Sequence, residues 1–296
     1  MPQKLKQPPW GTTPPMFLSA QALRAEGMTR RQMAKSVSDG RLIRVRNGRL
    51  LPTGAHADVI QAARLGGRVD CVSLLRHLGV FVLEKAPLHI QVDVGASRLP
   101  SCPTDVVRHW RTSPAPREQL ITDLEEALTQ ATRCQEPRAA IATLDSAWHL
   151  GLIDEEGITD IFARLPPRFR ALRPLLEPRC ESGAETLLRL MLRSLGCHID
   201  VQVKLRGVGR VDFIVDGWLV IECDSEAHHS GWDKQKRDRR RDVAAARLGY
   251  STIRVLAEDI MYHREKTLTA LKEVVRHGAR RVGVQNSSRT RRVAAR

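Results

Sequence analysis

"RVDFIVDGWLVIECDSEAHH", residues 210–229, places two β-branched, apolar runs on either side of an Asp-Gly turn signal. These runs predict two strands of an antiparallel hairpin that are buried in a sheet. The same stretch carries several carboxylates and a His-His pair. Charged side chains are costly to bury without partners, so this sheet is expected to hold a polar site.

The length of the turn decides which acids meet. Because strand side chains alternate, Glu222 and Asp224 share one face of their strand. A three-residue loop at 216–218 places Asp212 opposite Glu222, whereas a two-residue loop puts them on opposite faces. The sequence therefore predicts an odd loop, or a bulge with Gly217 at positive φ.

Acids that converge in this way favour a bound cation. Carboxylates a few ångströms apart in a half-buried pocket repel one another and resist ionisation. A divalent ion offsets that repulsion, and oxygen ligands suit Mg²⁺ or Mn²⁺ rather than zinc. The alternative is neutralisation by neighbouring arginines, without catalysis: Arg206, Arg210 or Arg254.

The order and spacing of the acids resemble a known enzyme group. Six residues carry the pattern: Glu185 within "ESGAETLLRLMLRSLG", then Asp212, Glu222, Cys223, Asp224 and His228. They resemble the PD-(D/E)xK nuclease superfamily, and more narrowly its branch related to the very-short-patch-repair (Vsr-like) endonucleases. Downstream "RRRDVAAARLGYSTIRV" fits the same branch. The resemblance covers about residues 180–275 and implies a restriction-endonuclease-like mixed sheet flanked by helices over 179–278.

The resemblance also implies roles for single residues. Asp212 and Glu222 would hold the metal ion, helped by the backbone carbonyl of Cys223. Glu185 would bind an outer water or a second ion. His228 would act as general base or protonate the leaving oxygen.

One position departs from the superfamily. Its lysine falls two residues after Glu222, where this chain has Asp224. Asp224 is then a further metal ligand or orients His228, or else it marks a lost activity. Three lysines are placed to restore the missing cation: Lys204, Lys234 and Lys236.

Next to these acids, "GWDKQKRDRRRD" at 231–242 predicts a helix rich in both charges. One interpretation is a solvated helix crossed by salt bridges, and the other is a clamp for phosphates beside the site. We assign a structural role, rather than a role in binding DNA, to Arg241 and Asp242. The cations expected to face DNA are Lys236, Arg239 and Arg240, together with Lys204 on the strand before the hairpin.

Residues 17–56 predict a winged helix-turn-helix. Leu18, Ala22 and Leu23 recur at helical spacing, Thr29 supplies an N-cap, and "RLIRVRNGRLL" reads as a hairpin around an Asn-Gly turn. The segment also resembles the winged-helix module of AbiEi-type antitoxins, which is often joined to this nuclease-like domain. The side chains expected to bind DNA are Arg30, Arg31 and Lys35 on the second helix, and Arg44, Arg46 and Arg49 in the wing. The alternative is a basic helix that packs against a neighbouring domain.

The remaining segments carry no motif with its own chemistry. Residues 1–16 are expected to form a flexible arm, and 57–178 a middle α/β and helical domain in which Leu120, Leu124 and Leu128 share a helix face. Residues 279–296 are expected to form a disordered basic tail. The scattered cysteines are interpreted as reduced core residues, and three histidines as structural: His89, His109 and His149.

The net charge of the chain indicates which class of molecule it binds. A net charge of +15 over 296 residues concentrates polyanions, which makes nucleic acid the first partner to consider. The length of 296 residues predicts two or three domains, and the elements described above make the fold class multidomain α/β. A hydrophobic content of 42% predicts a globular protein, and the lack of a long apolar run predicts a protein of the cytoplasm without a membrane span.

These observations favour a DNA-binding endonuclease that depends on Mg²⁺ or Mn²⁺, cuts double-stranded DNA and acts in repair or in defence against foreign DNA. The alternative is a non-catalytic DNA-binding transcriptional regulator, resembling an AbiEi-type antitoxin, in which the nuclease-like fold only grips DNA. RNA cleavage is a third hypothesis. The retained acids favour an enzyme, since a domain without activity has no use for such costly charge.

Overall fold

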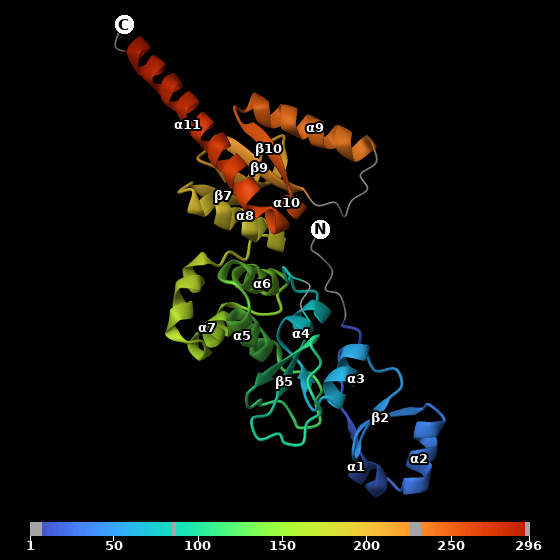
Figure 1. The fold of residues 1–296 in the computed structure, drawn as a ribbon. Helices are drawn as coiled ribbons and strands as arrows, with labels where there is room; N and C mark the ends of the chain where they lie inside the picture. The colour runs from blue at the N-terminus through green and yellow to red at the C-terminus, as the bar shows by residue number, and fades with distance from the viewer. Residues whose placement is uncertain (1–7, 85–86, 225–231, 294–296) are drawn as a thin grey trace. The chain divides into compact units, whose positions relative to one another are not determined.

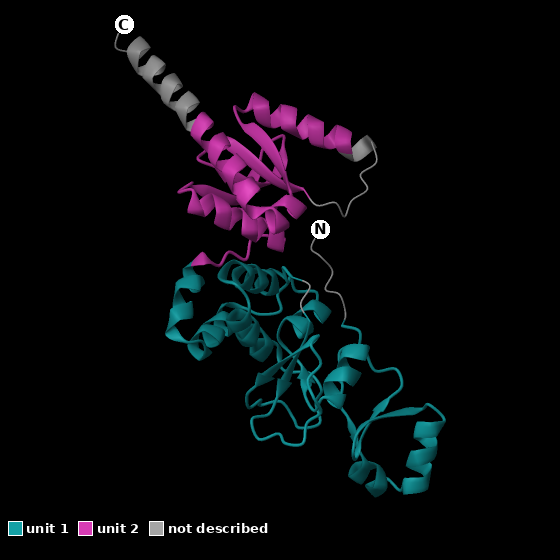
Figure 2. Cartoon of the chain, viewed as in Figure 1, with its two compact units in different colours: residues 1–174 teal, residues 175–296 magenta. Residues whose placement is uncertain are grey.

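The computed structural model describes residues 8–84, 87–224 and 232–293. The chain divides into two compact units, Met1–Pro174 and Leu175–Arg296 (Figure 2). Both contain helices and strands, so the protein is mixed α/β, as predicted. Within the described ranges, no helix combines the length and the apolar character that a membrane crossing demands.

The first unit begins with a small antiparallel sheet of order β1-β3-β2 and two helices (Figure 1). Its elements are β1 (Leu18–Ser19), α1 (Ala20–Ala25), α2 (Arg30–Ser38), β2 (Leu42–Arg46) and β3 (Arg49–Pro52).

Local signals explain these boundaries. Thr29 and Gln32 form a reciprocal capping box that starts α2. Gly48 has a φ of 70° in the Asn-Gly turn between β2 and β3. Leu18 differs from the prediction, because it pairs with Leu50 across β1 and β3. The Ser19 side chain accepts the Ala22 N–H, so α1 begins at Ala20, two residues after Leu18.

A second sheet, of order β4-β5-β6, forms the middle of this unit. The elements around it are α3 (Ala57–Arg64), β4 (Arg68–Val69), α4 (Cys71–His77), β5 (Leu88–Val92) and β6 (Val106–Trp110). β5 and β6 run parallel, and β4 is antiparallel to β5.

Four helices complete the unit: α5 (Leu124–Cys134), α6 (Pro137–His149), α7 (Glu155–Arg164) and a 3-10 helix (Pro167–Leu175). Leu120 does not share the helix face predicted for it. Its carbonyl accepts the N–H of Val69 at 2.8 Å, which holds it in an extended segment before α5 begins. Apolar spacing alone does not reveal such a long-range backbone bond.

The second unit is built on a four-stranded sheet of order β10-β9-β8-β7. Its elements are α8 (Gly183–Ser194), β7 (Ile199–Leu205), β8 (Gly209–Val215), β9 (Leu219–Asp224), α9 (Trp232–Arg247), β10 (Ser251–Leu256), α10 (Ala257–Tyr262) and α11 (Arg264–Val293). β10 is parallel to β9 and the other neighbours are antiparallel, so the sheet is mixed, as predicted. Ala245 of α9 packs on Ile214 and Val220 of the sheet.

The hairpin turn has the odd length that the sequence predicts. Three residues, 216–218, separate β8 from β9, and Gly217 has a φ of 71°. Phe213 pairs with Ile221, so the same register continued by one residue brings Asp212 opposite Glu222.

The C-terminal segment differs from the prediction. Residues 279–296 are expected to be disordered, but α11 continues as far as Val293. Residues 279–293 contain no proline, and their five arginines and Ala279 have high helix propensity.

Leu188→Ala should test the core of the second unit. Leu188 of α8 is 0% exposed, so its truncation is expected to lower the free energy of unfolding by about 2–5 kcal/mol. Leu248→Ala removes the same atoms where the side chain is 53% exposed, and is expected to change stability by less than about 0.5 kcal/mol. Urea denaturation followed by circular dichroism measures both. Equal losses would contradict this assignment of the core.

Candidate functional site

The first acid of the site lies at the start of α8. Ser182 caps the helix by accepting the Glu185 N–H at 3.2 Å, and Glu185 Oε2 accepts the backbone N–H of Glu181 at 2.8 Å. These two hydrogen bonds fix the Glu185 carboxylate at the helix N-terminus. The residue is only 7% exposed, so its charge is largely removed from water.

A glutamine joins this acid to the hairpin. Gln202 Nε2 donates to Glu185 Oε2 at 3.0 Å and to Asp212 Oδ1 at 3.3 Å. The other Asp212 oxygen, Oδ2, accepts the Cys223 N–H at 2.8 Å. Gln202 has a φ of 55° within β7, a left-handed conformation that is uncommon for a residue with a side chain. The strand therefore bends out of regular geometry at the residue that links the two carboxylates.

The remaining acids are paired with arginines. Arg241 Nη2 of α9 lies 3.0 Å from Glu222 Oε1. Arg254 Nη1 of β10 lies 3.4 Å from Asp224 Oδ1, and its Nη2 lies 2.8 Å from Asp242. Of the arginines considered from the sequence, Arg254 thus contacts Asp224. The partner of Glu222, however, comes from α9.

Arg210, the second of those arginines, forms an ion pair with Glu181. Arg241 and Asp242 both form bonds inside the unit, which agrees with their structural assignment, although their partners are Glu222 and Arg254 rather than each other.

Burial and repulsion oppose ionisation here. Burial, and then the charge of Asp212, raises the pKa of Glu185 to about 7. Burial raises the pKa of Asp212, and burial together with Asp212 raises the pKa of Glu222. In the described part of the chain, neither Glu185 nor Asp212 forms an ion pair, although the charge of Arg241 partly offsets the raised pKa of Asp212. Negative charge therefore exceeds positive charge at this point, and a cation would offset the difference.

The donors fit a hard divalent ion. Every candidate ligand atom is a carboxylate oxygen, as Mg²⁺ and Mn²⁺ prefer. Within the described ranges, no three of these acids bring an oxygen each within 4.8 Å of one another. An ion would thus be held directly by two carboxylates and keep several waters, which is usual for Mg²⁺.

The other residues expected at this site are placed unevenly. His228 lies outside the described residues, as does the side chain of Lys234. Lys204 is exposed on β7, opposite Arg210 of β8. On α9, Arg239 and Arg240 are exposed and Lys236 is half-buried.

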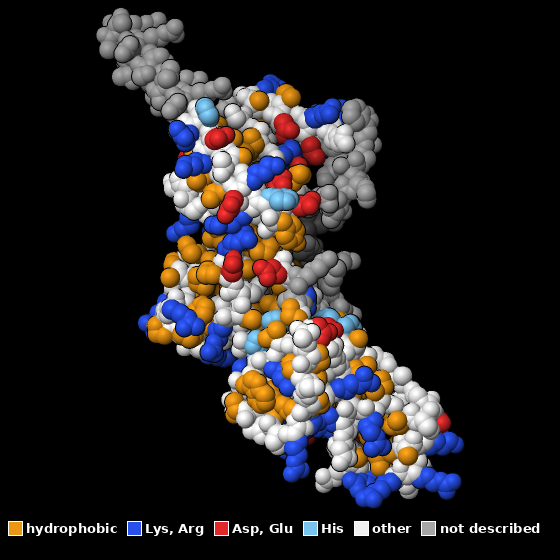
Figure 3. Space-filling model, viewed as in Figure 1, with side chains coloured by type: hydrophobic (Ala, Val, Ile, Leu, Met, Phe, Trp, Pro, Cys, Tyr) orange, Lys and Arg blue, Asp and Glu red, His pale blue; other side chains and the backbone are white. Residues whose placement is uncertain are grey.

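In the first unit, basic side chains gather over the end that carries α1 and α2 (Figure 3). Arg30, Arg31 and Lys35 are exposed on α2. Arg30 and Arg44 line one cavity of about 280 Å³ beside the β2–β3 turn, whereas Arg31 and Lys35 do not.

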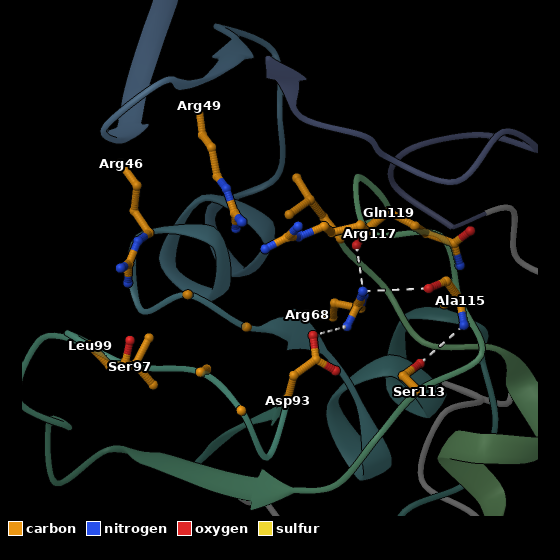
Figure 4. Close-up of a pocket in the computed structure, with 15 residues that line it drawn as sticks. Arg46, Arg49, Arg68, Asp93, Ser97, Leu99, Ser113, Ala115, Arg117 and Gln119 are labelled. Atoms are coloured by element: carbon orange, nitrogen blue, oxygen red, sulfur yellow. Dashed lines mark hydrogen bonds and ion pairs between the residues drawn. The ribbon is translucent and has the colours of Figure 1, made fainter. Parts of the chain in front are cut away.

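A larger cavity of about 610 Å³ lies between the β2–β3 hairpin and the middle sheet, and we call it the arginine pocket. Figure 4 shows Arg46, Arg49 and Arg117 around it. Burial, followed by the charges of Arg117 and Arg46, lowers the pKa of Arg49. Arg68 at the pocket floor is offset by Asp93, at 3.5 Å.

A glycine leaves room for the Arg46 side chain in the arginine pocket. Gly66 has a φ of 81°, and a Cβ there would lie 2.7 Å from Arg46 Nη1. That nitrogen is buried and has no hydrogen-bond partner among the described residues. Buried donors are normally satisfied, so this one is available to an anionic ligand.

Sequence reasoning missed three contributors. The role of Gln202 could not be predicted, because the alternation of side chains along a strand does not reveal a residue with a left-handed backbone. Arg241 was not connected with Glu222, since 19 positions separate them. Arg117 lies in a loop that has no periodic pattern to align it with Arg46.

Glu185→Gln should change how stability depends on pH in metal-free protein. Folded Glu185 keeps its proton up to about pH 7, while an unfolded glutamate loses it near 4.5. The wild type should therefore lose stability as the pH rises through that window, and the neutral amide should remove the loss. Urea denaturation in EDTA at about pH 5 and about pH 8 measures the difference. Parallel curves for the two proteins would contradict the raised pKa.

Comparison with known proteins bears on this unit. A family model, REase_MTES_1575 of the restriction-endonuclease-like type, matches residues 185–275. No curated protein matches the sequence significantly. The match begins at Glu185 and spans the sheet, α9 and the acids described above, and it supports a restriction-endonuclease-like domain with nuclease activity in this part of the chain.

Proposed function

We propose that this protein is a divalent-metal-dependent endonuclease that hydrolyses phosphodiester bonds of double-stranded DNA, in repair or in defence against foreign DNA. The observation that carries the proposal is the pair formed by buried Glu185 and half-buried Asp212, which share one amide donor and form no ion pair among the described residues. DNA is a polyanion, so an uncompensated acidic site is unfavourable for binding DNA unless a cation is also bound.

The residues divide the chemistry in a way that follows from their contacts. Asp212 and Glu222 would hold Mg²⁺ or Mn²⁺, which on binding supplies positive charge for the phosphate and lowers the pKa of water. Gln202 fixes the orientation of Asp212, and Arg241 limits the charge on Glu222. Assignment to the Vsr-like branch gives His228 the proton-transfer role and Asp224 an orienting role.

DNA binding is proposed for two groups of cations. In the first unit, α1, α2 and the β2–β3 hairpin would act as a winged helix-turn-helix of the AbiEi type, with α2 in the major groove. The arginine pocket would bind backbone phosphate beside it. In the second unit, Lys204, Lys236, Arg239 and Arg240 would face the phosphates.

Two contacts favour a second candidate, a non-catalytic DNA-binding regulator. Arg241 already pairs with Glu222, and Asp224, which replaces the superfamily's lysine, pairs with Arg254. Internal neutralisation of this kind can maintain a fold whose activity is lost. The two candidates differ in one measurable property, which is cleavage that requires a divalent ion.

Asp212→Asn and Glu222→Gln should abolish cleavage. Each change removes a negative charge with little change of shape, so activity with Mg²⁺ or Mn²⁺ is expected to fall by more than about 100-fold. Gel assays with duplex DNA, mismatched DNA and RNA, with and without EDTA, measure the loss and identify the substrate.

Asp200→Asn is the matched control, because Asp200 lies on β7 with its side chain 53% exposed and should be dispensable. If the wild type binds DNA but leaves every substrate intact with either ion, the regulator is the correct function. Cleavage that survives in EDTA would exclude the proposed dependence on metal.

Arg46→Gln combined with Arg49→Gln should weaken DNA binding. If each arginine neutralises about one phosphate, the slope of log affinity against log salt should fall by roughly two. Fluorescence anisotropy with duplex DNA over a salt series measures it. Arg164→Gln, whose side chain is 52% exposed and pairs with Glu125 outside the pocket, should leave the slope unchanged. An unchanged slope for the double variant would remove the pocket from the DNA-binding surface.

A further inference from the structure

Four metal-ligating side chains meet in the first unit, far along the sequence from the acids of the second. The Cys2His2 cluster consists of Cys71, His89, His109 and Cys134. One ligand atom from each residue lies within 4.8 Å of the ligand atoms of all the others. The nuclease chemistry proposed above makes no use of any of them.

The fold brings these residues together from four elements. His89 of β5 pairs with Val107 of the parallel strand β6, so His109 lies on the same face of the sheet as His89. Cys71 is the first residue of α4 and Cys134 the last residue of α5, and the two helices pack on each other beside β5 (Figure 1). Helix ends and strand faces thus converge from segments separated by 17 or more residues.

The spacing of the ligand atoms matches a tetrahedral metal site. Zn–S bonds of about 2.3 Å and Zn–N bonds of about 2.0–2.1 Å imply nitrogens about 3.3 Å apart and sulfur about 3.6 Å from nitrogen. His89 Nδ1 and His109 Nε2 are 3.0 Å apart, and Cys134 Sγ lies 3.8 Å from His89 Nδ1. Both separations are within a few tenths of an ångström of those a zinc ion requires.

Hydrogen bonding alone leaves this cluster incompletely satisfied. Two imidazole nitrogens that face each other can share only one proton, so the pair makes one bond. His89 is 5% exposed and Cys71 is 0% exposed, so water is largely kept from these two residues, whereas His109 is half-buried and Cys134 is exposed. A single cation would accept both nitrogen lone pairs and both sulfurs at once.

The backbone supplies a second observation. Cys71 has a φ of 52°, a left-handed conformation that costs energy for any residue other than glycine. The preceding residue is held on both oxygens: Asp70 accepts from Arg111 at 2.7 and 2.9 Å, and Oδ1 also accepts from Thr122 at 2.7 Å. The hydrogen bonds of Asp70 thus help to hold Cys71 in an unfavourable backbone conformation, and in that conformation its sulfur lies in the cluster.

We propose that the Cys2His2 cluster binds one structural Zn²⁺ ion. Two sulfurs and two nitrogens select zinc over the hard cations suited to the acidic site. Four protein ligands leave no open position for substrate, so the ion is structural rather than catalytic. It fastens the ends of α4 and α5 to β5 and β6, in a unit whose first sheet is small.

Metal analysis of the full-length protein tests the proposal. Purified without chelator, the wild type is expected to carry about one zinc per chain by elemental mass spectrometry. Cys134→Ala should lose that zinc, whereas Cys102→Ala, an exposed cysteine of the same unit, should keep it. Asp212→Asn should also keep it, which separates this site from the acidic one.

Spectroscopy and stability distinguish loss of a ligand from loss of the fold. Cobalt substituted into the wild type should show the visible absorption of a tetrahedral, thiolate-bound ion, and Cys134→His should retain an altered form of it. Removing zinc should lower the melting temperature, and adding Zn²⁺ should restore it. Wild type that binds neither zinc nor cobalt would overturn the proposal. So would a protein without metal whose mass is two hydrogens lower, because Cys71 and Cys134 would then form a disulfide.

Discussion

Two carboxylates held in low solvent exposure by a single amide define the nuclease-like unit. Gln202 donates to both Glu185 and Asp212, and its own backbone is left-handed inside a strand. Such a conformation costs about 1–3 kcal/mol, and burial of like charges adds to that. A fold keeps these liabilities together only where the rest of the domain over-determines them, here through α8, the three-residue hairpin turn and the Cys223 N–H.

The remaining acids show how the unit limits this charge without removing it. Arg241 and Arg254 reach Glu222 and Asp224 from α9 and β10, so half of the acidic group is compensated from inside the domain. Among the described residues, no ion pair compensates Glu185 or Asp212, although the charge of Arg241 also acts on Asp212. If arginines neutralised all four acids, the group would be a structural ion-pair network. If no arginine neutralised any of them, the repulsion between the acids would strongly destabilise the fold. The partial state is the one in which an added divalent ion gains the most.

The sequence was most informative where local chemistry decides the structure. The Asp-Gly turn and strand alternation predicted the three-residue loop and the register of Asp212 with Glu222, and Thr29 predicted the start of α2. It was least informative where distant segments meet. Leu120 was assigned to a helix from its apolar spacing, which gives no information about the backbone hydrogen bond that Leu120 accepts from Val69. His89 and His109 were interpreted as structural histidines because the sequence does not show that they lie close together. Their proximity to each other and to the cysteines depends on the parallel pairing of β5 and β6.

Electrostatics also couples the two ligands proposed for the second unit. Exposed cations such as Lys204 and Arg240 attract a DNA backbone, while the buried acids repel any phosphate that approaches them. A divalent ion at Asp212 and Glu222 reverses the local sign, so it lowers the free energy of placing a phosphate there. By linkage, DNA must then raise the affinity for the ion by the same factor. Metal and DNA should therefore bind cooperatively, and the coupling originates in the charge that Arg241 and Arg254 leave uncompensated.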